Sequence, residues 1–444
     1  MSVPRLVVAA PATGQGKTTI ATGLMAALRR RGLVVSGHKV GPDYIDPGYH
    51  ALATGRPGRN LDPHLVGEER VVPLLLHGAE GADVAVVEGV MGLFDGRVGG
   101  GGFASTAHVA ALTRTPVLLV VDCARSSRSV GAVVHGMATF DPSVEVVGVV
   151  LNQVGSPRHA AEVVSSVRLP VLGQVPRDAS VSTPSRHLGL VPAAERALSA
   201  AALDPLTDLV EQHVDIDAVL ALAATAPDVD AVAWRPPVRP PGPGRPVVAV
   251  AGGRAFTFRY PETEELLRAS GCDPVVLDPL HDTFLPSGTT GVYLGGGFPE
   301  VHATGLAANR SLMAQLHDAV ADGLPTVAEC AGLLYLCRSL DGVVMTGAVP
   351  ADATMTERLT LRYPEAVAAS DSLLTRAGER VTGHEFHRTH VTPEAGSAGL
   401  EPAWLVDGRP TGFASPTLHA SYLHTHWAGH PQLAERFAAA VHRA

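Results

Sequence analysis

Cys330 stands where a largely apolar run that predicts a short buried strand, Leu324 to Val327, gives way to a helical pattern, Leu333 to Leu336. A cysteine at such a turn lies near a helix N-terminus, where the dipole and free backbone amides stabilise a thiolate and a neighbouring oxyanion. This is the placement of a nucleophile. Most cysteines are small buried residues, so the turn by itself leaves both interpretations open.

Two other segments carry the groups that a cysteine nucleophile requires. An expected strand, Gly291 to Leu294, ends in a glycine run whose amides could approach a tetrahedral intermediate, and we expect Gly296 and Gly297 to donate there. Ala420 to His424 predicts a strand with a histidine at its end, which could serve as the base. His426 lies one alternation further on the same expected face, so the choice between the two histidines depends on strand register.

A strand, a glycine loop and a helix follow one another near the start of the chain. The strand is expected at residues 5–10 and the helix at 20–30, with Pro11-Ala-Thr-Gly-Gln-Gly-Lys-Thr-Thr19 between them. This is the context of a Walker A phosphate loop, although Pro11 takes the place of the usual first glycine. The predicted nucleotide contacts in this loop are Gly14, Gly16, Lys17, Thr18 and Thr19, with Lys17 at the β and γ phosphates.

Charged residues end the next strands of the expected sheet. Lys39 lies near the end of the strand Val34 to Val40 and could neutralise a transferring phosphate, and Glu88 follows the strand at 83–87 in the Walker B position. We predict Thr18, Asp46 and Glu88 as ligands of Mg²⁺. Aspartates beside proline and glycine are equally typical of turns, so a structural role for Asp46 stays open.

Further candidates lie in loops and at strand ends. Asn152 follows the expected strand Val146 to Leu151 and is either an adenine contact or a strand-end cap. A basic pair, Arg186 and His187, could face a carboxylate-rich substrate. The predicted substrate-facing set is Asp43, Tyr44, Arg186 and His187.

Composition limits the class of protein. The chain has 444 residues, a formal net charge of −9 and 46% hydrophobic residues, which indicates globular domains and argues against a nucleic acid partner. No apolar run approaches the length of a membrane span. Four cysteines without a CxxC pair suggest neither a zinc site nor a disulfide framework. We therefore expect a cytoplasmic protein.

A proline-rich segment divides the chain. Residues 234–246 have no capacity for a helix or a strand ladder and predict a linker between a domain at 1–233 and another at 247–444. Expected strands alternate with helical stretches in the first domain, including a helix-rich stretch at 193–224. The predicted fold class is α/β, with a doubly wound parallel sheet in the N-terminal domain and a second α/β domain after the linker.

Both halves resemble known domains. The C-terminal half resembles the class I glutamine amidotransferase domain in the form found in cobyrinic acid a,c-diamide synthases and cobyric acid synthases. The N-terminal half resembles the dethiobiotin-synthetase-like P-loop domain of the a,c-diamide synthase family. The residues that carry the resemblance are Gly14 to Thr19, Gly41 to Pro47, Glu88 to Gly96, Arg186 to Leu190, Gly295 to Glu300, Cys330, Gly383 to His387 and Ala420 to His424.

The resemblance assigns roles in the amidotransferase half. It implies that Cys330 is the nucleophile, that His424 activates it, and that ammonia is released from glutamine through a glutamyl thioester. His430-Pro-Gln lies in an expected turn and is not taken as the catalytic histidine motif. No acidic residue follows His424 in the usual place, which leaves the third member of the triad unassigned.

The resemblance also implies a reaction. ATP with Mg²⁺ would phosphorylate a substrate carboxylate, and ammonia would displace the phosphate to give an amide. The implied substrate is cobyrinic or hydrogenobyrinic acid, amidated at the a and c acetates in cobalamin biosynthesis. The alternatives are an amidase for other tetrapyrroles or of the cobyric acid synthase type, and a regulatory P-loop ATPase with a degenerate amidotransferase tail. The oligomeric state is not decided, and a homodimer is one expected assembly.

Overall fold

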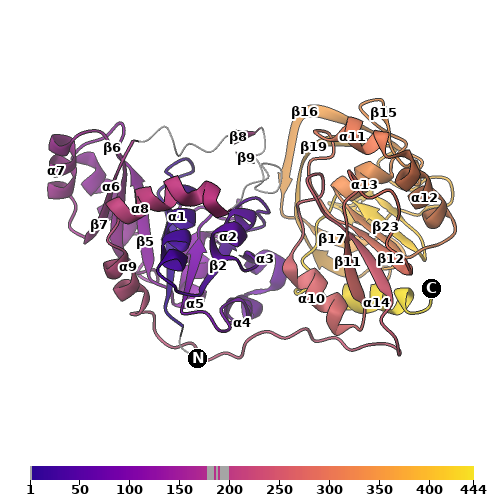
Figure 1. The fold of residues 1–444 in the computed structure, drawn as a ribbon, viewed down its shortest axis with the longest axis horizontal. Coiled ribbons are helices and arrows are strands. Elements are labelled where there is room, and N and C mark those ends of the chain that lie inside the picture. The colour runs from indigo at the N-terminus through magenta and orange to yellow at the C-terminus, as the bar shows by residue number, and fades with distance from the viewer. Residues whose placement is uncertain (1–2, 178–184, 187–188, 191–199) are drawn as a thin grey trace. The chain divides into compact units, whose positions relative to one another are not determined.

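The computed structural model describes residues 3–177, 185–186, 189–190 and 200–444 (Figure 1). The chain divides into two compact units, one formed by residues up to 63 together with 67–235, the other by 64–66 together with 236–444. Within the described ranges, no helix has the length and apolar character needed to cross a membrane.

The first unit is built on a seven-stranded sheet in which each pair of neighbours is parallel. In spatial order the strands are β3 (Arg59–Leu61), β2 (Val35–Val40), β4 (Val84–Glu88), β1 (Arg5–Ala9), β5 (Val117–Asp122), β6 (Val146–Val154) and β7 (Val171–Pro176). Strands β1 and β4 are buried along their whole length, as expected for a parallel sheet with helices on both faces.

Helices connect these strands (Figure 1). They are α1 (Lys17–Arg30), α2 (Asp46–Thr54), α3 (Pro63–Val66), α4 (Glu68–Gly78), α5 (Thr106–Thr113), α6 (Ser129–Thr139), α7 (Pro157–Ser166), α8 (Asp204–His213) and α9 (Ile216–Ala223). Apolar side chains of α1, α8 and α9 pack on β1, β4 and β5 in one buried cluster that includes Ile20, Leu24 and Val210. A short pair, β8 (Ser185–Arg186) and β9 (Gly189–Leu190), and the 3-10 helix Ala200–Leu203 complete the described part of this unit.

The second unit contains a six-stranded sheet that is parallel except at one edge. Its order is β11 (Asp273–Leu277), β10 (Val247–Ala251), β12 (Thr289–Leu294), β13 (Thr326–Glu329), β23 (Leu418–Ser421) and β22 (Phe413–Ala414). The helices are α10 (Pro261–Ala269), α11 (Ala303–Ala308), α12 (Arg310–Ala321), α13 (Ala331–Leu336) and α14 (Pro431–Val441).

Two four-stranded sheets complete the second unit. One has the order β15 (Val343–Val344), β14 (Ser339–Leu340), β16 (Asp352–Arg362) and β19 (Glu385–Thr392). The other has the order β18 (Arg380–Thr382), β17 (Glu365–Ala368), β20 (Trp404–Val406) and β21 (Arg409–Thr411).

The predicted fold class is confirmed, with differences at the ends of elements. β6 continues to Val154, three residues beyond the expected end. The helix-rich stretch expected at 193–224 lies partly outside the described residues, and the remainder is broken between α8 and α9. Val214 there pairs with Gly173 as an isolated bridge, and the Asp215 side chain accepts a hydrogen bond from the amide of Ala218 at the start of α9. This cap begins a new helix rather than continuing the old one.

The proline-rich segment has no regular structure. Residues 226–246 form neither helix nor strand. The amide of Trp234 donates a hydrogen bond of 2.8 Å to the carbonyl of Pro73, so the start of the segment is held by the first unit. The division between the compact units falls just after Trp234, between Arg235 and Pro236.

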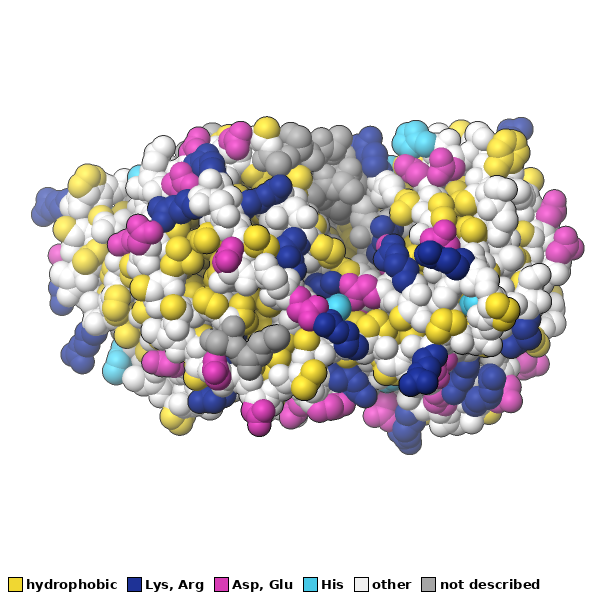
Figure 2. Space-filling view, turned by 60° about the horizontal axis from the view of Figure 1, so that its bottom comes forward, with side chains coloured by type: hydrophobic (Ala, Val, Ile, Leu, Met, Phe, Trp, Pro, Cys, Tyr) yellow, Lys and Arg dark blue, Asp and Glu magenta, His cyan; other side chains and the backbone are white. Residues whose placement is uncertain are grey.

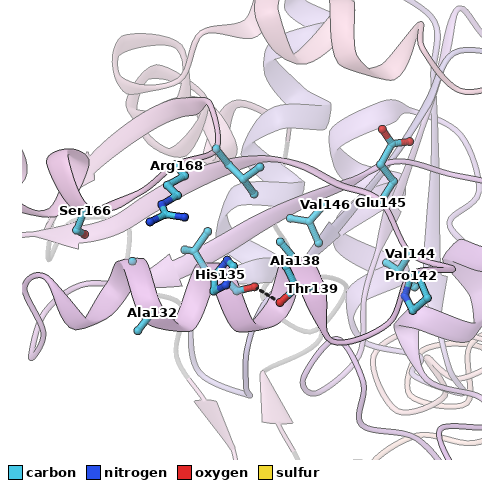
Figure 3. Close-up of a pocket in the computed structure, with 13 residues that line it drawn as sticks. Ala132, His135, Ala138, Thr139, Pro142, Val144, Glu145, Val146, Ser166 and Arg168 are labelled. Atoms are coloured by element: carbon cyan, nitrogen blue, oxygen red, sulfur yellow. Dashed lines mark hydrogen bonds between the residues drawn. The ribbon is translucent and has the colours of Figure 1, made fainter.

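The surface shows no segregation of charge on the face seen in Figure 2, where basic and acidic side chains are interspersed. A hollow of about 630 Å³ lies on the first unit (Figure 3). One wall carries His135 and Thr139 of α6, and the other carries Ser166 and Arg168. Its described lining contains none of the residues predicted for catalysis or binding, which are found elsewhere.

Candidate active sites

Cys330 lies at the junction of β13 and α13, as its sequence context predicts. Its backbone has φ 49° and ψ −99°, an uncommon conformation for a residue with a side chain. The Cys330 amide donates to the carbonyl of Ser421 at 2.8 Å, and the amide of Gly332 donates to Gly295 at 3.0 Å. These bonds to two neighbouring segments hold the strained turn, a geometry typical of nucleophile elbows.

His424 contacts Cys330, but it does not end a strand. β23 stops at Ser421, and His424 pairs with His384 through an isolated two-bond bridge, with N–O distances of 2.9 and 3.1 Å. The expectation of a strand through His424 was therefore wrong. The bridge replaces sheet pairing, so the alternation that would put His426 on the same face does not apply.

The charge state of His424 follows from its neighbours. Burial opposes a positive charge on this imidazole, but the Cys330 sulfur and the Glu329 carboxylate more than offset burial and raise the pKa of His424 to about 10. At neutral pH the histidine is therefore protonated, and it lies beside the Cys330 sulfur. A thiolate paired with an imidazolium is the reactive form of a cysteine nucleophile.

His426 faces a different environment. Its ring stacks on Tyr260 with a centroid distance of 4.1 Å, and its Nε2 lies 3.7 Å from Oε2 of Glu262. His430, in turn, accepts a hydrogen bond at Nε2 from the amide of Thr382. Neither contact brings these histidines to Cys330, and the geometry favours His424 as the activating base.

A pair of histidine variants tests this choice. We expect His424→Asn to lower the glutaminase rate by about a hundredfold or more, because the thiolate loses its proton acceptor and counter-charge. His426→Asn should change the rate by less than about threefold, since that ring packs against Tyr260 and Glu262. Steady-state release of glutamate, measured on folded variants, compares them. The reverse ranking would assign the base to His426.

The glycine run differs from its expected role at one position. The Gly296 amide donates to the carbonyl of Phe258 at 3.0 Å, and the Phe258 amide donates back to Gly296. Because that bridge occupies the Gly296 amide, the prediction that it donates to an oxyanion does not fit this arrangement. Gly297 remains a candidate, and a Cβ there would lie 2.0 Å from the carbonyl oxygen of Ala255, so glycine is required.

The other candidate amide was missed by the sequence analysis. Ala331 is the first residue of α13, and no helical partner exists for its N–H at that position. It directly follows the nucleophile, as the second donor does in other nucleophile elbows. The position of Ala331 directly after Cys330 could have identified this amide from the sequence.

The phosphate loop of the first unit connects β1 to α1. Gly14 and Gly16 have φ values of 82° and 96°, which glycine adopts without strain, and Gly16 caps α1. Thr18 and Thr19 lie in the first turn of the helix. Lys17 Nζ donates to the carbonyls of Ala12 at 3.1 Å and Met91 at 2.5 Å. Burial, with a contribution from Lys39, lowers the pKa of Lys17 to about 8.

The predicted acidic and basic partners converge on one point. Thr18 Oγ1 donates to Glu88 at 2.6 Å and lies 3.4 Å from Asp46. Lys39 Nζ is 2.6 Å from Asp46 and 3.0 Å from Glu88. Burial acts against the charges, yet Asp46 and Glu88 raise the pKa of Lys39, and Lys39 with other donors lowers the pKa of Glu88. Lys39 and Glu88 are therefore both charged.

The sequence analysis missed His50, whose Nε2 lies 2.7 Å from the other oxygen of Glu88. Its position in α2, beneath the strand end that carries Glu88, was not readable from spacing because the chain has twenty histidines. The imidazole fixes the orientation of the Glu88 carboxylate.

The donor set here fits Mg²⁺. In the described parts of the chain, no cluster of three His, Cys, Asp or Glu side chains could hold a metal alone. Mg²⁺ needs fewer protein ligands, because it keeps waters and binds phosphate oxygens beside one or two carboxylates. The Thr18 hydroxyl with the Asp46 and Glu88 carboxylates supplies hard oxygen ligands of this kind.

Other predicted residues have local contacts. Asn152 lies inside β6, not at its end, and its Nδ2 donates to the carbonyl of Gln15 at 2.9 Å. It supports the phosphate loop in this arrangement rather than facing outward to a base. Oδ1 of Asp43 accepts from the amides of Ile45 and Asp46, which is turn chemistry at the start of α2. Tyr44 is half-buried beside it.

The basic pair is only partly described. Arg186 lies in β8, which pairs with β9 in an antiparallel fashion. His187 lies outside the described residues. Their predicted approach to a substrate stays a prediction.

A phosphate loop with a Walker B carboxylate on one unit and a Cys–His pair on the other is the combination used by ligases that take ammonia from glutamine. A model of the CobQ/CobB/MinD/ParA nucleotide binding domain matches residues 6–191, and a model of the CobB/CobQ-like glutamine amidotransferase domain matches residues 247–432.

Relatives match along almost the whole chain. The hydrogenobyrinate a,c-diamide synthase of Thermobifida fusca is 59% identical, over 99% of this chain and 97% of its own. The protein of that name from Streptomyces coelicolor is 54% identical, over 98% and 97%. The cobyrinate a,c-diamide synthase of Synechococcus is 40% identical, over 99% and 98%. The chain belongs to the family of a,c-diamide synthases, glutamine-dependent ligases of cobalamin biosynthesis.

Proposed function

We propose that this chain uses ATP and glutamine to amidate the a and c acetate carboxylates of hydrogenobyrinic acid. The observation that carries the proposal is the presence on one chain of a Cys330–His424 pair and a phosphate loop whose Lys17 lies near Lys39 and Glu88. The metal-free substrate is favoured because five relatives named for hydrogenobyrinate are 50 to 59% identical, against 38 to 43% for three named for cobyrinate.

The glutaminase half-reaction uses the second unit. The Cys330 thiolate attacks the carboxamide carbon of glutamine, and the amides of Gly297 and Ala331 receive the developing oxyanion. His424, as imidazolium, gives its proton to the leaving ammonia. The resulting thioester is hydrolysed by water, from which His424 takes a proton. Glutamate leaves and the pair is restored.

The synthetase half-reaction uses the first unit. A substrate carboxylate resists attack by ammonia because its carbonyl carbon is a poor electrophile, and transfer of a phosphoryl group makes it an acyl phosphate with a good leaving group. Lys17 and Lys39 stabilise the negative charge on the transferring phosphoryl group. Thr18, Asp46 and Glu88 would hold a Mg²⁺ ion, which would neutralise negative charge on the phosphates. Ammonia then displaces phosphate and forms the amide.

The test is a mass-spectrometric assay with ATP, Mg²⁺ and glutamine and either hydrogenobyrinic or cobyrinic acid. We expect hydrogenobyrinic acid to be amidated twice in succession. Each amidation should lower the mass by about 1 Da and should require both ATP and glutamine. Cobyrinic acid should be used less efficiently. A reaction confined to cobyrinic acid would reverse the choice of substrate, and ATP hydrolysis without product from either acid would contradict the proposal.

We also infer a cytoplasmic location, where ATP and glutamine are both available, and a homodimeric assembly, which light scattering of the purified protein would test. The four cysteines are free and buried, which accords with a reducing compartment.

A further inference from the structure

Glu329 is a buried carboxylate beside the nucleophile for which the sequence offered no role. It is the last residue of β13, directly before Cys330, and is 4% exposed. One oxygen accepts hydrogen bonds from the hydroxyl of Thr425 at 2.8 Å and from its amide at 3.3 Å. The other accepts from the hydroxyl of Tyr293 at 3.0 Å. A carboxylate with these donors is fixed in orientation.

The oxygen that Tyr293 binds also faces the catalytic histidine. Oε2 of Glu329 lies 3.8 Å from Nδ1 of His424, while the same imidazole contacts Cys330. Successive residues of a strand point to opposite faces. The sharp turn at Cys330 nevertheless lets the side chains of Glu329 and Cys330 both reach the imidazole of His424. Burial, together with the Glu329 carboxylate, raises the pKa of Tyr293 well above its usual value, so the phenol stays a donor.

Two histidines among the described neighbours of His424 supply no negative charge. His384 stacks on it at 4.8 Å, nearly parallel, and His387 lies close enough to be affected by its charge. Burial lowers the pKa of both, and His424 lowers it further, so both are neutral at pH 7. Among these described neighbours, Cys330 and Glu329 are the groups that raise the pKa of His424.

We propose that Glu329 is the third member of the triad, a positioning residue that orients the His424 imidazole and stabilises its protonated form. The proposal rests on the proposed glutaminase activity and names a group for it that does not follow the histidine in sequence. The carboxylate comes instead from the residue before the nucleophile, on the neighbouring parallel strand of the sheet.

The test is Glu329→Gln, with the glutaminase kcat/KM measured as a function of pH. We expect a loss of about ten- to a hundredfold at neutral pH, since Gln keeps the size and the acceptor oxygen but removes the charge. Glu329 favours the protonated imidazole, so loss of the Glu329 charge lowers the pKa of His424. As the pH rises, the variant therefore loses activity at a lower pH than the wild type does. The alkaline limb should shift down by about one pH unit or more. Ammonium-driven synthesis should be unchanged.

Glu262→Gln is the matched control. Glu262 is also buried, and its carboxylate lies at a similar distance, 3.7 Å, from a histidine, His426. It should leave both the rate and the alkaline limb of the pH profile close to wild type. If the two variants behave alike, or if Glu329→Gln lowers the rate without moving the alkaline limb, Glu329 has only a structural role.

A second variant and the wild-type protein serve as further controls. Should Glu329→Gln fail to fold by circular dichroism, Thr425→Val, which removes one donor to the carboxylate, is expected to shift the limb in the same direction with a loss of about three- to tenfold. An unshifted limb in folded Thr425→Val would overturn the proposal. Failure of the proposed function is distinct, because wild-type protein would then show no glutaminase activity.

Discussion

Replacing Cys330 with alanine should abolish amidation driven by glutamine and leave amidation driven by ammonium salt near the wild-type rate. The loss should reach at least about a thousandfold, because the thiol that forms the thioester is removed. The phosphate loop, which activates the substrate carboxylate, is built from residues of the other compact unit. The measurement is product formation by mass spectrometry with each nitrogen source, together with glutamate release.

Cys337→Ala is the control for this experiment. Cys337 follows the other end of α13, is fully buried, and has a pKa that burial raises to about 12, so it remains a thiol. Its removal should preserve both activities. A folded Cys330→Ala variant that has lost ammonium-driven synthesis as well would contradict the division of labour between the two units.

Lys17→Ala should produce the complementary result. We expect amidation to fall about a hundred- to a thousandfold with either nitrogen source, because the transferring phosphoryl group loses a preorganised positive charge. Glutamate release should continue, although any coupling between the two reactions would appear as a change in its rate. ATP consumption and glutamate release, measured in the same samples, separate the two half-reactions.

Arg30→Ala is the matched control, since it removes a cation from the other end of the same helix. Arg30 is exposed and pairs with Asp208 and Glu211 on α8, and exposed pairs of this kind contribute little to stability. Activity should stay close to wild type. Equal losses in the two variants would indicate damage to α1 rather than loss of a phosphate contact.

The sequence was most informative where function depends on local geometry. The turn at Cys330 and the loop before Lys17 are each defined by a strand, a few fixed residues and a helix, all adjacent in the chain. The parallel sheet of the first unit could also be predicted, because its strands are continuous apolar runs separated by helical stretches. The edge strand β3 (Arg59–Leu61) was not predicted, because its sequence also fits a turn, and other strands differed by a few residues at their ends.

Features that depend on pairing between distant segments were not predictable. His424 is placed by its bridge to His384, and the Gly296 amide is taken by Phe258, neither of which leaves a pattern in the sequence. Glu329 was overlooked because an acid was sought after the histidine, whereas the alignment of β13 beside β23 brings it from before the cysteine. Asn152 was predicted to follow a strand because the apolar run ends at Leu151, whereas the backbone pairing of β6 continues to Val154.

The backbone conformation of Cys330 has an evolutionary consequence. A side chain held in a sparsely populated region of φ/ψ space costs about 1–3 kcal/mol of folding free energy, and glycine would relieve most of it. Selection for stability alone would therefore favour losing the sulfur. A descendant that received ammonia from another source would be expected to drift towards glycine at this position.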